Sequence, residues 1–422
     1  MKLFPHQVRA LELTSDFENC AYYLDMGLGK TFIGSERLIK YGLNKNLVVC
    51  QKSKVEDWLE HFKTYYSNYS FLNLTNKKEY DLFVSLSNSE KAIGIINYDV
   101  IYRRKELLKL TDFTLLLDES SKIKNKSAKR TKFILKLKPS HVILLSGTPS
   151  SGKYENMWTQ AHLLGWHISN KLFDSHYVNF KKIYIGGVYI NTVDMSNPYK
   201  NEDRLKDKLR QHGAIYMKSE EVIDLPEQTF IEIPCKTTKD YQTFLKTSYL
   251  RREDGLELVG DTIFTKRLYE RMLCSAYNPN KLEVLEDLID STQDRIVIFY
   301  QFNNELDSVK MLCEKKNRPI SLINGTTKDL ENYNNCSDSI TCVQYQSGAM
   351  GINLQKANKL VYFTLPESSD LFEQSKKRVH RIGQSRPCFY YLLICKDSIE
   401  EKIYARLKQL KDYDDYLFKG DN

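Results

Sequence analysis

Residues 21–31, A-Y-Y-L-D-M-G-L-G-K-T, join a short apolar run to a glycine-rich turn and then to an amphipathic segment. A strand that passes through such a turn into a helix is the setting of a phosphate-binding loop. There the glycines let backbone N–H groups close on phosphates, and the start of the helix adds positive potential. We expect Lys30 to reach the β- and γ-phosphates of a nucleotide and Thr31 to bind Mg²⁺. The strict G-x-x-x-x-G-K-T spacing fails because Leu24 replaces the first glycine, so an ordinary glycine-rich turn is the alternative.

Short apolar runs of strand length recur on both sides of a central region. Most are apolar on both faces, as a parallel sheet covered by helices requires. The runs are residues 21–24, 47–50, 93–96, 114–117 and 142–145 in the first half and 296–300, 320–323, 341–345, 360–364 and 389–394 in the second. Amphipathic segments lie between them, for example residues 31–41, 55–65 and 304–315. The alternation predicts an α/β fold with parallel sheets.

The central region, from residue 150 to about residue 280, is rich in Tyr and Lys and has helical patches at residues 154–164, 201–212 and 261–273. Proline disfavours helix before it, so Pro226 predicts a hinge. We expect five segments in chain order: a first lobe at 1–150, a helical and hairpin insertion attached to it at 151–225, a helical linker of the second lobe at 226–280, a second lobe at 281–411 that ends in an amphipathic helix at 398–411, and a polar tail at 412–422.

The 422 residues, 41% of them hydrophobic and 27% charged, form a globular and not a disordered composition. No apolar run approaches the roughly eighteen residues of a membrane span, and acids stand where a secretion signal would need an apolar core. The nine cysteines include no C-x-x-C pair, so neither a zinc site nor a redox pair is predicted, and we expect reduced thiols in a cytoplasm. The 62 Lys and Arg against 54 acids give a net charge of +8, which mildly favours a polyanionic partner.

A second part of a nucleotide site lies where the apolar run at 114–117 ends in Asp118 and Glu119. Ligands of parallel α/β sheets bind at this carboxyl edge. We expect Asp118 to hold Mg²⁺ through water and Glu119 to polarise the attacking water. Ser146 and Thr148 follow the next run, where their hydroxyls could sense the γ-phosphate. Acids and hydroxyls at strand ends are also ordinary surface features, and the phosphate loop upstream favours the functional interpretation.

Residues 374–384, Q-S-K-K-R-V-H-R-I-G-Q, form the most specific stretch of the chain. If they are helical, Arg378 and Arg381 stand at i and i+3 and share a face. Two arginines delivered from the second half to a phosphate in the first would act as arginine fingers. The alternative is a solvated basic helix, which the flanking Gln374 and Gln384 make less plausible.

With these residues in view, the chain resembles the Swi/Snf-type ATPases of helicase superfamily two across nearly its whole length. The matching stretches are, in order, FPHQ at 4–7, DMGLGKT at 25–31, VVCQKS at 48–53, DESSKIKN at 118–125, LSGTP at 145–149, VIFYQF at 297–302, SGAMGINL at 347–354 and RVHRIGQ at 378–384. The resemblance implies two tandem RecA-like lobes with parallel sheets, a helical insertion between them, and ATP with Mg²⁺ as the bound nucleotide.

The resemblance also implies roles for individual residues. Gln7 would read adenine, Gly351 would join the ATP contacts, and Gln374 would act with the two arginines. The implied ATP contacts are Gln7, Gly27, Leu28, Gly29, Lys30, Thr31 and Gly351. Motors of this family run along the phosphate backbone of duplex DNA, which positions a protein without reading sequence. The implied DNA contacts are Lys52, Ser53, Asn97, Tyr98, Lys122, Lys124, Gln301, Ser347 and Gly348, with added basic grip from Lys126.

Three residues depart from the family pattern. Asp25 replaces a glutamate, Gln51 replaces a proline, and Ser121 replaces the histidine of the D-E-A-H form. That histidine helps to couple contacts between the lobes to the nucleotide, so we count Ser121 with Ser146 and Thr148 as coupling residues whose behaviour is altered here. The short central region indicates a stripped motor, and the compact, Lys- and Asn-rich chain suggests a bacterial or phage source.

Three hypotheses remain open from the sequence. The first is a monomeric, DNA-dependent ATPase that translocates on double-stranded or branched DNA and remodels DNA structures or protein–DNA complexes in replication, recombination or repair, in the cytoplasm of a bacterial or phage-infected cell. The second is a strand-separating helicase of phage replication, for which residues 183–190, I-Y-I-G-G-V-Y-I, are the candidate hairpin. The third is a DNA-binding clamp unable to hydrolyse ATP, which the intact set of candidate catalytic residues disfavours.

Overall fold

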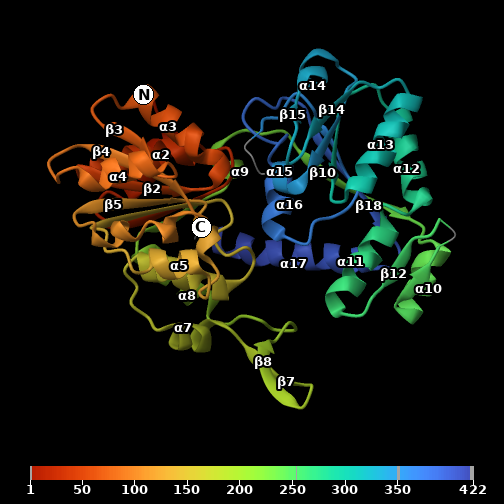
Figure 1. Cartoon of the computed structure of the whole chain (residues 1–422), viewed down its shortest axis with the longest axis horizontal. Helices are drawn as coiled ribbons and strands as arrows, with labels where there is room; N and C mark the ends of the chain where they lie inside the picture. Colours follow the sequence, from red (N-terminus) through yellow and green to blue (C-terminus); the bar gives the residue numbers. More distant parts are fainter. Residues whose placement is uncertain (1, 253, 349–351, 419–422) are drawn as a thin grey trace. The chain divides into compact units, whose positions relative to one another are not determined.

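The computed structural model describes residues 2–252, 254–348 and 352–418. The chain divides into two compact units (Figure 1). The first comprises Met1–Val222 together with the C-terminal end of the chain from Lys411, and the second comprises Ile223–Leu410. Each unit is built around its own sheet and its own hydrophobic core.

The sheet of the first unit has the order β3-β4-β2-β5-β6-β1-β9, and all neighbouring strands in it are parallel. The strands are β1 (Asn19–Leu24), β2 (Lys45–Cys50), β3 (Ser70–Asn73), β4 (Ala92–Asn97), β5 (Phe113–Asp118), β6 (His141–Ser146) and β9 (Ala214–Met217). The central strands β2 and β4 are buried along their whole length. Such burial explains why their sequences do not alternate between apolar and polar residues.

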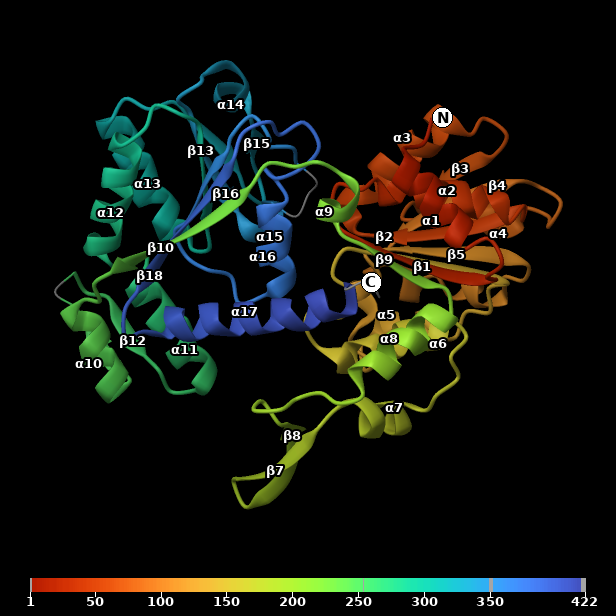
Figure 2. The same cartoon turned by 180° about the vertical axis from the view of Figure 1, so that it is seen from behind.

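Helices cover both faces of this sheet, with α2 and α3 on one face and α5, α6 and α8 on the other (Figure 2). The helices are α1 (Pro5–Leu13), α2 (Lys30–Lys40), α3 (Val55–Tyr65), α4 (Lys77–Ser85), α5 (Lys129–Ile134), α6 (Trp158–Leu163), α7 (Asn170–Tyr177), α8 (Glu202–Gln211) and α9 (Ser219–Val222). Side-chain caps fix where two of them begin, because Asn76 accepts from Lys78 N at α4 and Ser169 accepts from Leu172 N at α7.

A two-stranded antiparallel hairpin, β7 (Phe180–Ile185) and β8 (Val188–Val193), projects from the first unit (Figures 1 and 2). Gly186 and Gly187 form its two-residue turn with φ angles of +58° and +86°. Positive φ at both central residues is the geometry of a type I′ turn, which glycine adopts readily. The hairpin predicted at residues 183–190 is therefore present.

The sheet of the second unit has the order β10-β18-β17-β13-β16-β14-β15, and only the β14–β15 pair in it is antiparallel within the described residues. The strands are β10 (Gln228–Cys235), β13 (Ile296–Tyr300), β14 (Ile320–Ile323), β15 (Lys328–Asp329), β16 (Ile340–Gln344), β17 (Lys359–Tyr362) and β18 (Cys388–Cys395). A separate antiparallel pair is formed by β11 (Tyr249–Arg251) and β12 (Glu257–Val259).

The helices of the second unit supply the cover of its core. They are α10 (Lys239–Thr247), α11 (Ile263–Cys274), α12 (Pro279–Asp290), α13 (Asn303–Lys315), α14 (Glu331–Asn335), α15 (Tyr345–Gly348), α16 (Ser369–Lys376) and the first part of α17 (Ile399–Phe418). Among the residues that the structure describes, no helix combines the length and the apolar character that a membrane span needs.

The α/β architecture with two tandem RecA-like lobes is confirmed, and a strand is found at every apolar run that predicted one. The central region is less helical than expected, because β9 and β10 arise from it and each adds an edge strand to one of the two sheets. In β10, residues on the two faces alternate in burial, so its sequence T-F-I-E-I-P lacks the continuous apolar run of the inner strands.

The C-terminal helix is also longer than predicted. α17 continues to Phe418, so residues 412–418 of the predicted polar tail are helical. The division between the units falls within α17, after Leu410. In the first unit, Tyr413 packs its ring edge against Tyr199 at a centroid distance of 4.7 Å, and its carbonyl accepts a hydrogen bond from Tyr154.

Candidate nucleotide site

Three loops of the first unit meet because the strands before them, β1, β6 and β5, are parallel neighbours. Their register places Tyr23 beside Ser146 and Leu145 beside Asp118. The phosphate loop, the Ser-Gly-Thr turn and the acidic pair therefore lie at one carboxyl edge of the sheet, where ligands of such sheets bind.

The phosphate loop is closed against α1. Gly29 has a φ of +72° immediately before α2, and a Cβ added there would overlap the side-chain amide of Gln7. That amide donates to the carbonyl of Leu28 at 3.2 Å, and Nε2 of His6 lies 3.1 Å from the same oxygen. The residue predicted to read adenine is thus bonded to the loop predicted to hold the phosphates.

Lys30 lies inside the loop. Its ammonium group donates to the carbonyls of Leu24 at 2.7 Å and of Asp25 at 3.1 Å. The position of a Cβ on Gly147 would be 3.4 Å from the Lys30 Nζ atom, so the turn after β6 passes close to this cation. A lysine held at the junction of two loops is placed to meet a phosphate between them.

Asp118 is held by an indole. Trp58, from α3, donates its Nε1–H to the Asp118 Oδ2 atom at 2.9 Å. Burial raises the pKa of Asp118, while the Trp58 hydrogen bond and the charges of Lys30 and Lys54 oppose the rise. A carboxylate whose charged form is disfavoured by burial gains free energy from a nearby cation.

Glu119 is the most constrained residue of the site. Its φ of +56° lies in the left-handed region, which costs a residue other than glycine about 1–3 kcal/mol. Its Oε1 atom accepts hydrogen bonds from the Ser121 and Ser146 hydroxyls, each at 3.0 Å. The two serine hydroxyls therefore fix the orientation of one carboxylate oxygen of Glu119, the acid predicted to polarise the attacking water.

Thr148 continues this chain of contacts. Its backbone N–H donates to the Ser146 hydroxyl at 3.2 Å, so a shift of the turn after β6 reaches Glu119 through one intermediate residue. The Thr148 Oγ1 atom is buried and has no hydrogen-bond partner among the described residues. The structure thus brings together the three coupling residues proposed from sequence.

These observations fit a nucleotide with its metal. An unsatisfied buried hydroxyl, a loop with room for no side chain at residue 29, a central lysine and a desolvated carboxylate are what phosphates and Mg²⁺ would contact. When bound, the metal would neutralise phosphate charge. Thr31, at the start of α2 and half-buried, and Asp118 are the residues placed to hold it.

Asp25, where the family pattern has glutamate, has a structural contact of its own. Its Oδ2 atom accepts from the backbone N–H of Ser219 at 3.1 Å and from the Ser219 hydroxyl at 2.7 Å. The phosphate loop is therefore bonded to the first residue of α9, 194 positions later in the chain.

In the second unit, the two predicted arginine fingers are not helical. α16 ends at Lys376, and Arg378 and Arg381 lie in the turns that follow. The two arginines therefore do not share a helical face as residues i and i+3. Arg378 is buried and Arg381 is partly exposed. Arg381 donates to the side chain of Asn353, and burial lowers its pKa.

The other candidates of the second unit are only partly described. Gln374 is buried on α16. Gln301 is half-buried, and its backbone N–H donates to Glu305 at 2.8 Å. Ser347 and Gly348 form the end of α15, and Gly351 lies outside the described residues.

The candidate DNA contacts of the first unit fall into two groups. Lys52 and Ser53 are exposed just after β2, and Lys122 and Lys124 are partly exposed. Asn97 and Tyr98 are buried, as their 4% and 3% exposure shows. The Tyr98 hydroxyl donates to the Asp118 carbonyl at 2.9 Å, and the Asn97 amide oxygen accepts from the Asp99 N–H. The Tyr98 side chain therefore supports the loop of Asp118 and Glu119 from inside, and both buried side chains offer little surface to DNA.

The sequence matched Trp58 to the helix that follows the family's motif Ia, but it predicted no contact for Trp58 or Ser219. Trp58 stands in the amphipathic segment after the second strand, where an indole reads as core. A polar signal was available only in its N–H group, which a buried tryptophan must satisfy. Nothing in the local sequence connects Ser219 to Asp25, because the contact is made by the folded sheet.

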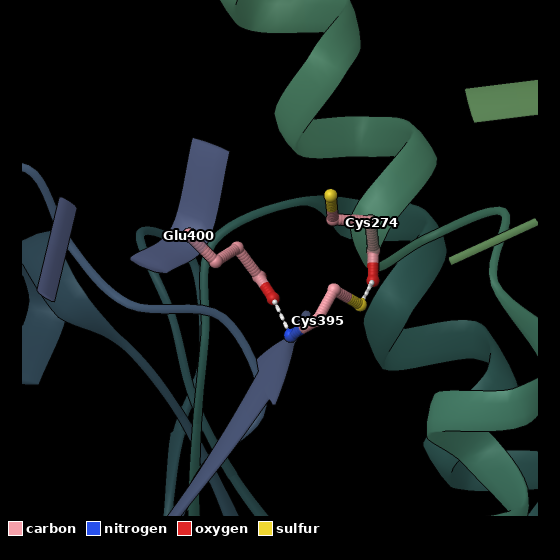
Figure 3. A group of neighbouring side chains, drawn as sticks. All are labelled: Cys274, Cys395 and Glu400. Carbon is pink, nitrogen blue, oxygen red and sulfur yellow. Dashed lines mark hydrogen bonds between the residues drawn. The ribbon is translucent and has the colours of Figure 1, made fainter. Parts of the chain in front are cut away.

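A group of potential metal ligands in the second unit is structural. The ligand atoms of Cys274, Cys395 and Glu400 lie within 4.8 Å of one another (Figure 3). However, Lys281 donates to both oxygens of Glu400, at 2.6 and 2.8 Å, and the Cys395 thiol donates to the Cys274 carbonyl. Burial raises the pKa of Cys274 well above its usual value, which disfavours the thiolate that a metal needs.

Together, the two α/β units and the phosphate loop with its acid pair define a protein of the RecA-like class of nucleotide-binding folds. The model of the SNF2-related domain matches residues 9–282, and that of the helicase conserved C-terminal domain matches residues 280–383. The chain belongs to the SNF2-related ATPases of helicase superfamily two.

Several curated relatives are similar over most of this chain. The mouse SWI/SNF-related matrix-associated actin-dependent regulator of chromatin subfamily A member 1 is 23% identical over 95% of the chain and 42% of its own length. The putative ATP-dependent helicase/translocase YwqA of Bacillus subtilis is 24% identical over 94% of the chain and 46% of its own length. The chain thus spans less than half of the length of these relatives.

A solved structure, the Sulfolobus solfataricus SWI2/SNF2 ATPase core in complex with dsDNA, is 21% identical and covers 100% of this chain and 94% of that chain, with a TM-score of 0.47.

Proposed function

We propose that this chain is a DNA-dependent ATPase motor that translocates on double-stranded DNA and remodels DNA structures or protein–DNA complexes. The observation that carries the proposal is the placement of Glu119, whose Oε1 atom is fixed by Ser146 and Ser121 at the edge of the sheet that also presents Lys30. A rigidly aimed carboxylate beside a phosphate loop is suited to orient a water molecule for attack on the γ-phosphate.

The residues of the site divide the work between binding and turnover. Gln7 and the loop at 25–31 bind the nucleotide, and Thr31 and Asp118 hold Mg²⁺. Arg378 and Arg381 stabilise the charge that develops on the transferred phosphoryl group, and Gln374 supports them. Ser121, Ser146 and Thr148 relay the loss of the γ-phosphate to the rest of the chain.

The DNA side of the proposal rests on the exposed basic and polar residues at the carboxyl ends of the strands. Lys52 and Ser53 follow β2, and Lys122 and Lys124 follow β5. Together with Gln301, Ser347 and Gly348 of the second unit, they would contact the phosphate backbone. The relatives named as a regulator of chromatin and as a putative helicase/translocase support a DNA substrate.

The test compares ATP hydrolysis by the wild-type chain on single strands, blunt duplex, forks and four-way junctions at equal nucleotide concentration. Duplex should stimulate hydrolysis. Glu119→Gln should reduce the hydrolysis rate by at least ~10²-fold with ATP binding retained, because an amide cannot accept the water proton.

Arg378→Ala or Arg381→Ala should reduce turnover on the order of 10³-fold. Hydrolysis that no DNA stimulates would contradict the proposal.

A strand-separating helicase is the second candidate, because the chain contains the β7–β8 hairpin, which is the candidate wedge for such an activity. Displacement of a triplex-forming strand and opening of a plain fork, measured on one preparation, separate the two. A duplex translocase displaces the third strand and opens the fork slowly, whereas a helicase opens the fork quickly and leaves the triplex.

A further inference from the structure

The β7–β8 hairpin has two chemically different faces. Directly paired residues of an antiparallel hairpin share a face, and successive pairs alternate between faces. The pairs Tyr184–Tyr189, Lys182–Asn191 and Phe180–Val193 therefore form one face, which we name the tyrosine face. The pairs Ile183–Ile190 and Lys181–Thr192 form the opposite, aliphatic face.

Near the turn, side chains of both faces are exposed in the part of the hairpin that the structure describes. Tyr184 and Tyr189, next to the turn, are 64% and 71% exposed, and Ile190 of the aliphatic face is 47% exposed. The two tyrosine rings contact each other, with centroids 5.0 Å apart. Large apolar side chains gathered on a projecting element indicate a surface that a partner covers.

The hairpin is firmly anchored although its tip is exposed. At its base, Asn179 donates its backbone N–H to Pro198 at 2.8 Å and accepts the Asp194 N–H at 2.8 Å. Val178 forms a bridge with Tyr199, and both residues are buried in the first unit. A two-stranded hairpin is marginal by itself, so this anchored base gives the tip a defined position.

The charges of the hairpin select a partner. Residues 180–193 include two lysines, Lys181 and Lys182, and no acid. Lys181 forms an ion pair with Asp194 at 3.1 Å. Lys182 lies on the tyrosine face, where its pair with Asn191 is the next one after Tyr184–Tyr189. Rings that stack on bases, next to a cation that meets phosphate, are the elements of a site for unpaired nucleic acid.

We propose that the tyrosine face binds the unpaired bases of a DNA strand where a duplex opens, with Tyr184 and Tyr189 stacked on bases and Lys182 on the adjacent phosphate. The inference deepens the proposed function, on which it rests, because it assigns the motor a contact specific to branched DNA. Stacking tolerates any base, so the contact would discriminate by strand structure and not by sequence.

The experiment measures the affinity of the full chain for two DNAs without nucleotide: a blunt duplex, and a fork with 2-aminopurine in its unpaired arms. Tyr184→Ala/Tyr189→Ala should weaken fork binding by about tenfold or more and restore the quenched 2-aminopurine fluorescence, with duplex binding unchanged. Tyr184→Phe/Tyr189→Phe should bind forks like the wild type, because the rings remain.

Two controls fix the interpretation. Ile183→Thr/Ile190→Thr changes the aliphatic face only, and Tyr249→Ala removes an exposed tyrosine from the antiparallel pair of the second unit; both should bind forks normally. Unchanged fork binding by the double alanine variant would overturn the inference. So would equal losses in the two face variants or a loss in the phenylalanine variant, results that point to a protein partner or to a structural role.

The wild-type ATPase rate on blunt duplex is measured in parallel. If duplex stimulates hydrolysis and the tyrosine variants still bind forks normally, the hairpin inference fails alone. If no DNA stimulates hydrolysis, the proposed function fails, whatever the hairpin binds.

Discussion

Glu119 shows how a single residue can carry two constraints that oppose each other. Its left-handed backbone favours glycine or asparagine, yet its carboxylate is the acceptor of both seryl hydroxyls. A strained conformation persists where the surrounding structure determines it, and the Ser121 and Ser146 hydrogen bonds are part of that determination. Ser121, which departs from the family pattern, thereby keeps a contact with the acid through a shorter side chain.

Trp58 is a second single residue on which the geometry of the site depends. Trp58→Phe keeps a ring beside Phe62 but removes the N–H that bonds Asp118. A hydrogen bond to a charged group is worth about 1.5–3 kcal/mol, so the Mg²⁺ concentration for half-maximal hydrolysis should rise about tenfold, with turnover nearly normal at saturating Mg²⁺.

Trp158→Phe is the matched control, because its indole donates to the Ile168 carbonyl at 2.8 Å and to no acid. This variant should leave the Mg²⁺ titration unchanged. A Trp58→Phe enzyme with a wild-type Mg²⁺ titration would show that the indole serves the core and does not position Asp118.

Between elements, Lys281 on α12 and Glu400 on α17 form a fully buried ion pair in the second unit. Their side chains are 0% and 1% exposed, and the Nζ–Oε1 distance is 2.6 Å. Burial alone would lower the pKa of Lys281, but the Glu400 carboxylate outweighs burial and raises it.

Lys281→Met leaves this carboxylate buried without its cation, so the free energy of unfolding should fall by about 3–5 kcal/mol. Replacing both partners, as Lys281→Met/Glu400→Leu, should recover most of the loss. Lys315→Met removes one member of an exposed pair with Glu286 and should cost less than about 1 kcal/mol. Urea titration measures the unfolding free energy of all three variants, and a Lys281→Met variant as stable as the wild type would contradict the prediction.

The contact between α2 and α3 predicts a dependence of stability on pH. The His61 ring forms a 2.8 Å hydrogen bond with the Ser35 hydroxyl and packs against Phe32. Burial lowers the pKa of His61 from 6.5 to about 4. Between these values the unfolded chain binds a proton that the folded chain does not, so stability falls as the pH is lowered from 6.5 to 4.

Thermal unfolding across this window checks the prediction. The Tm of the wild type should fall by roughly 2–4 °C more than that of His61→Gln. His176→Gln, which changes a partly exposed histidine of α7, should follow the wild-type profile. Parallel curves for wild type and His61→Gln would mean that the lowered pKa has no effect on stability.

At the scale of the whole molecule, the sequence was most informative where strands are buried on both faces. The run I-V-I-F-Y at Ile296–Tyr300 is a strand with the predicted bounds. The edge strands β9 and β10 were missed for different reasons. β9 is the four-residue run A-I-Y-M, which is short for a strand signal. β10 mixes polar and apolar residues because one of its sides lacks a neighbouring strand. The three loops of the nucleotide site were predicted because each follows a buried strand.

What the sequence could not supply is contact between distant residues. The bond from Trp58 to Asp118 crosses 60 positions, and the two hydroxyls on Glu119 come from different loops. The helical interpretation of Arg378 and Arg381 failed because α16 ends at Lys376, and no proline or glycine between 374 and 381 marks that end.

The net charge of +8 and a motor that follows the phosphate backbone together predict a steep salt dependence. Each phosphate neutralised adds about −0.9 to the slope of log K against log salt on duplex DNA, so six contacts would give a slope near −5. Titrations on two unrelated duplexes of equal length should coincide. A flat response, or a marked preference for one sequence, would argue against backbone tracking.

The bond between Asp25 and Ser219 has an evolutionary consequence. It fastens the phosphate loop to the segment that ends the first unit at Val222, with both donors of Ser219 on one carboxylate oxygen. A glutamate at position 25 would push the carboxylate one methylene further, and a residue without a hydroxyl at position 219 would remove one of the two hydrogen bonds from residue 219. Positions 25 and 219 should therefore co-vary in proteins related to this chain, so that sequences that differ at one position also differ at the other.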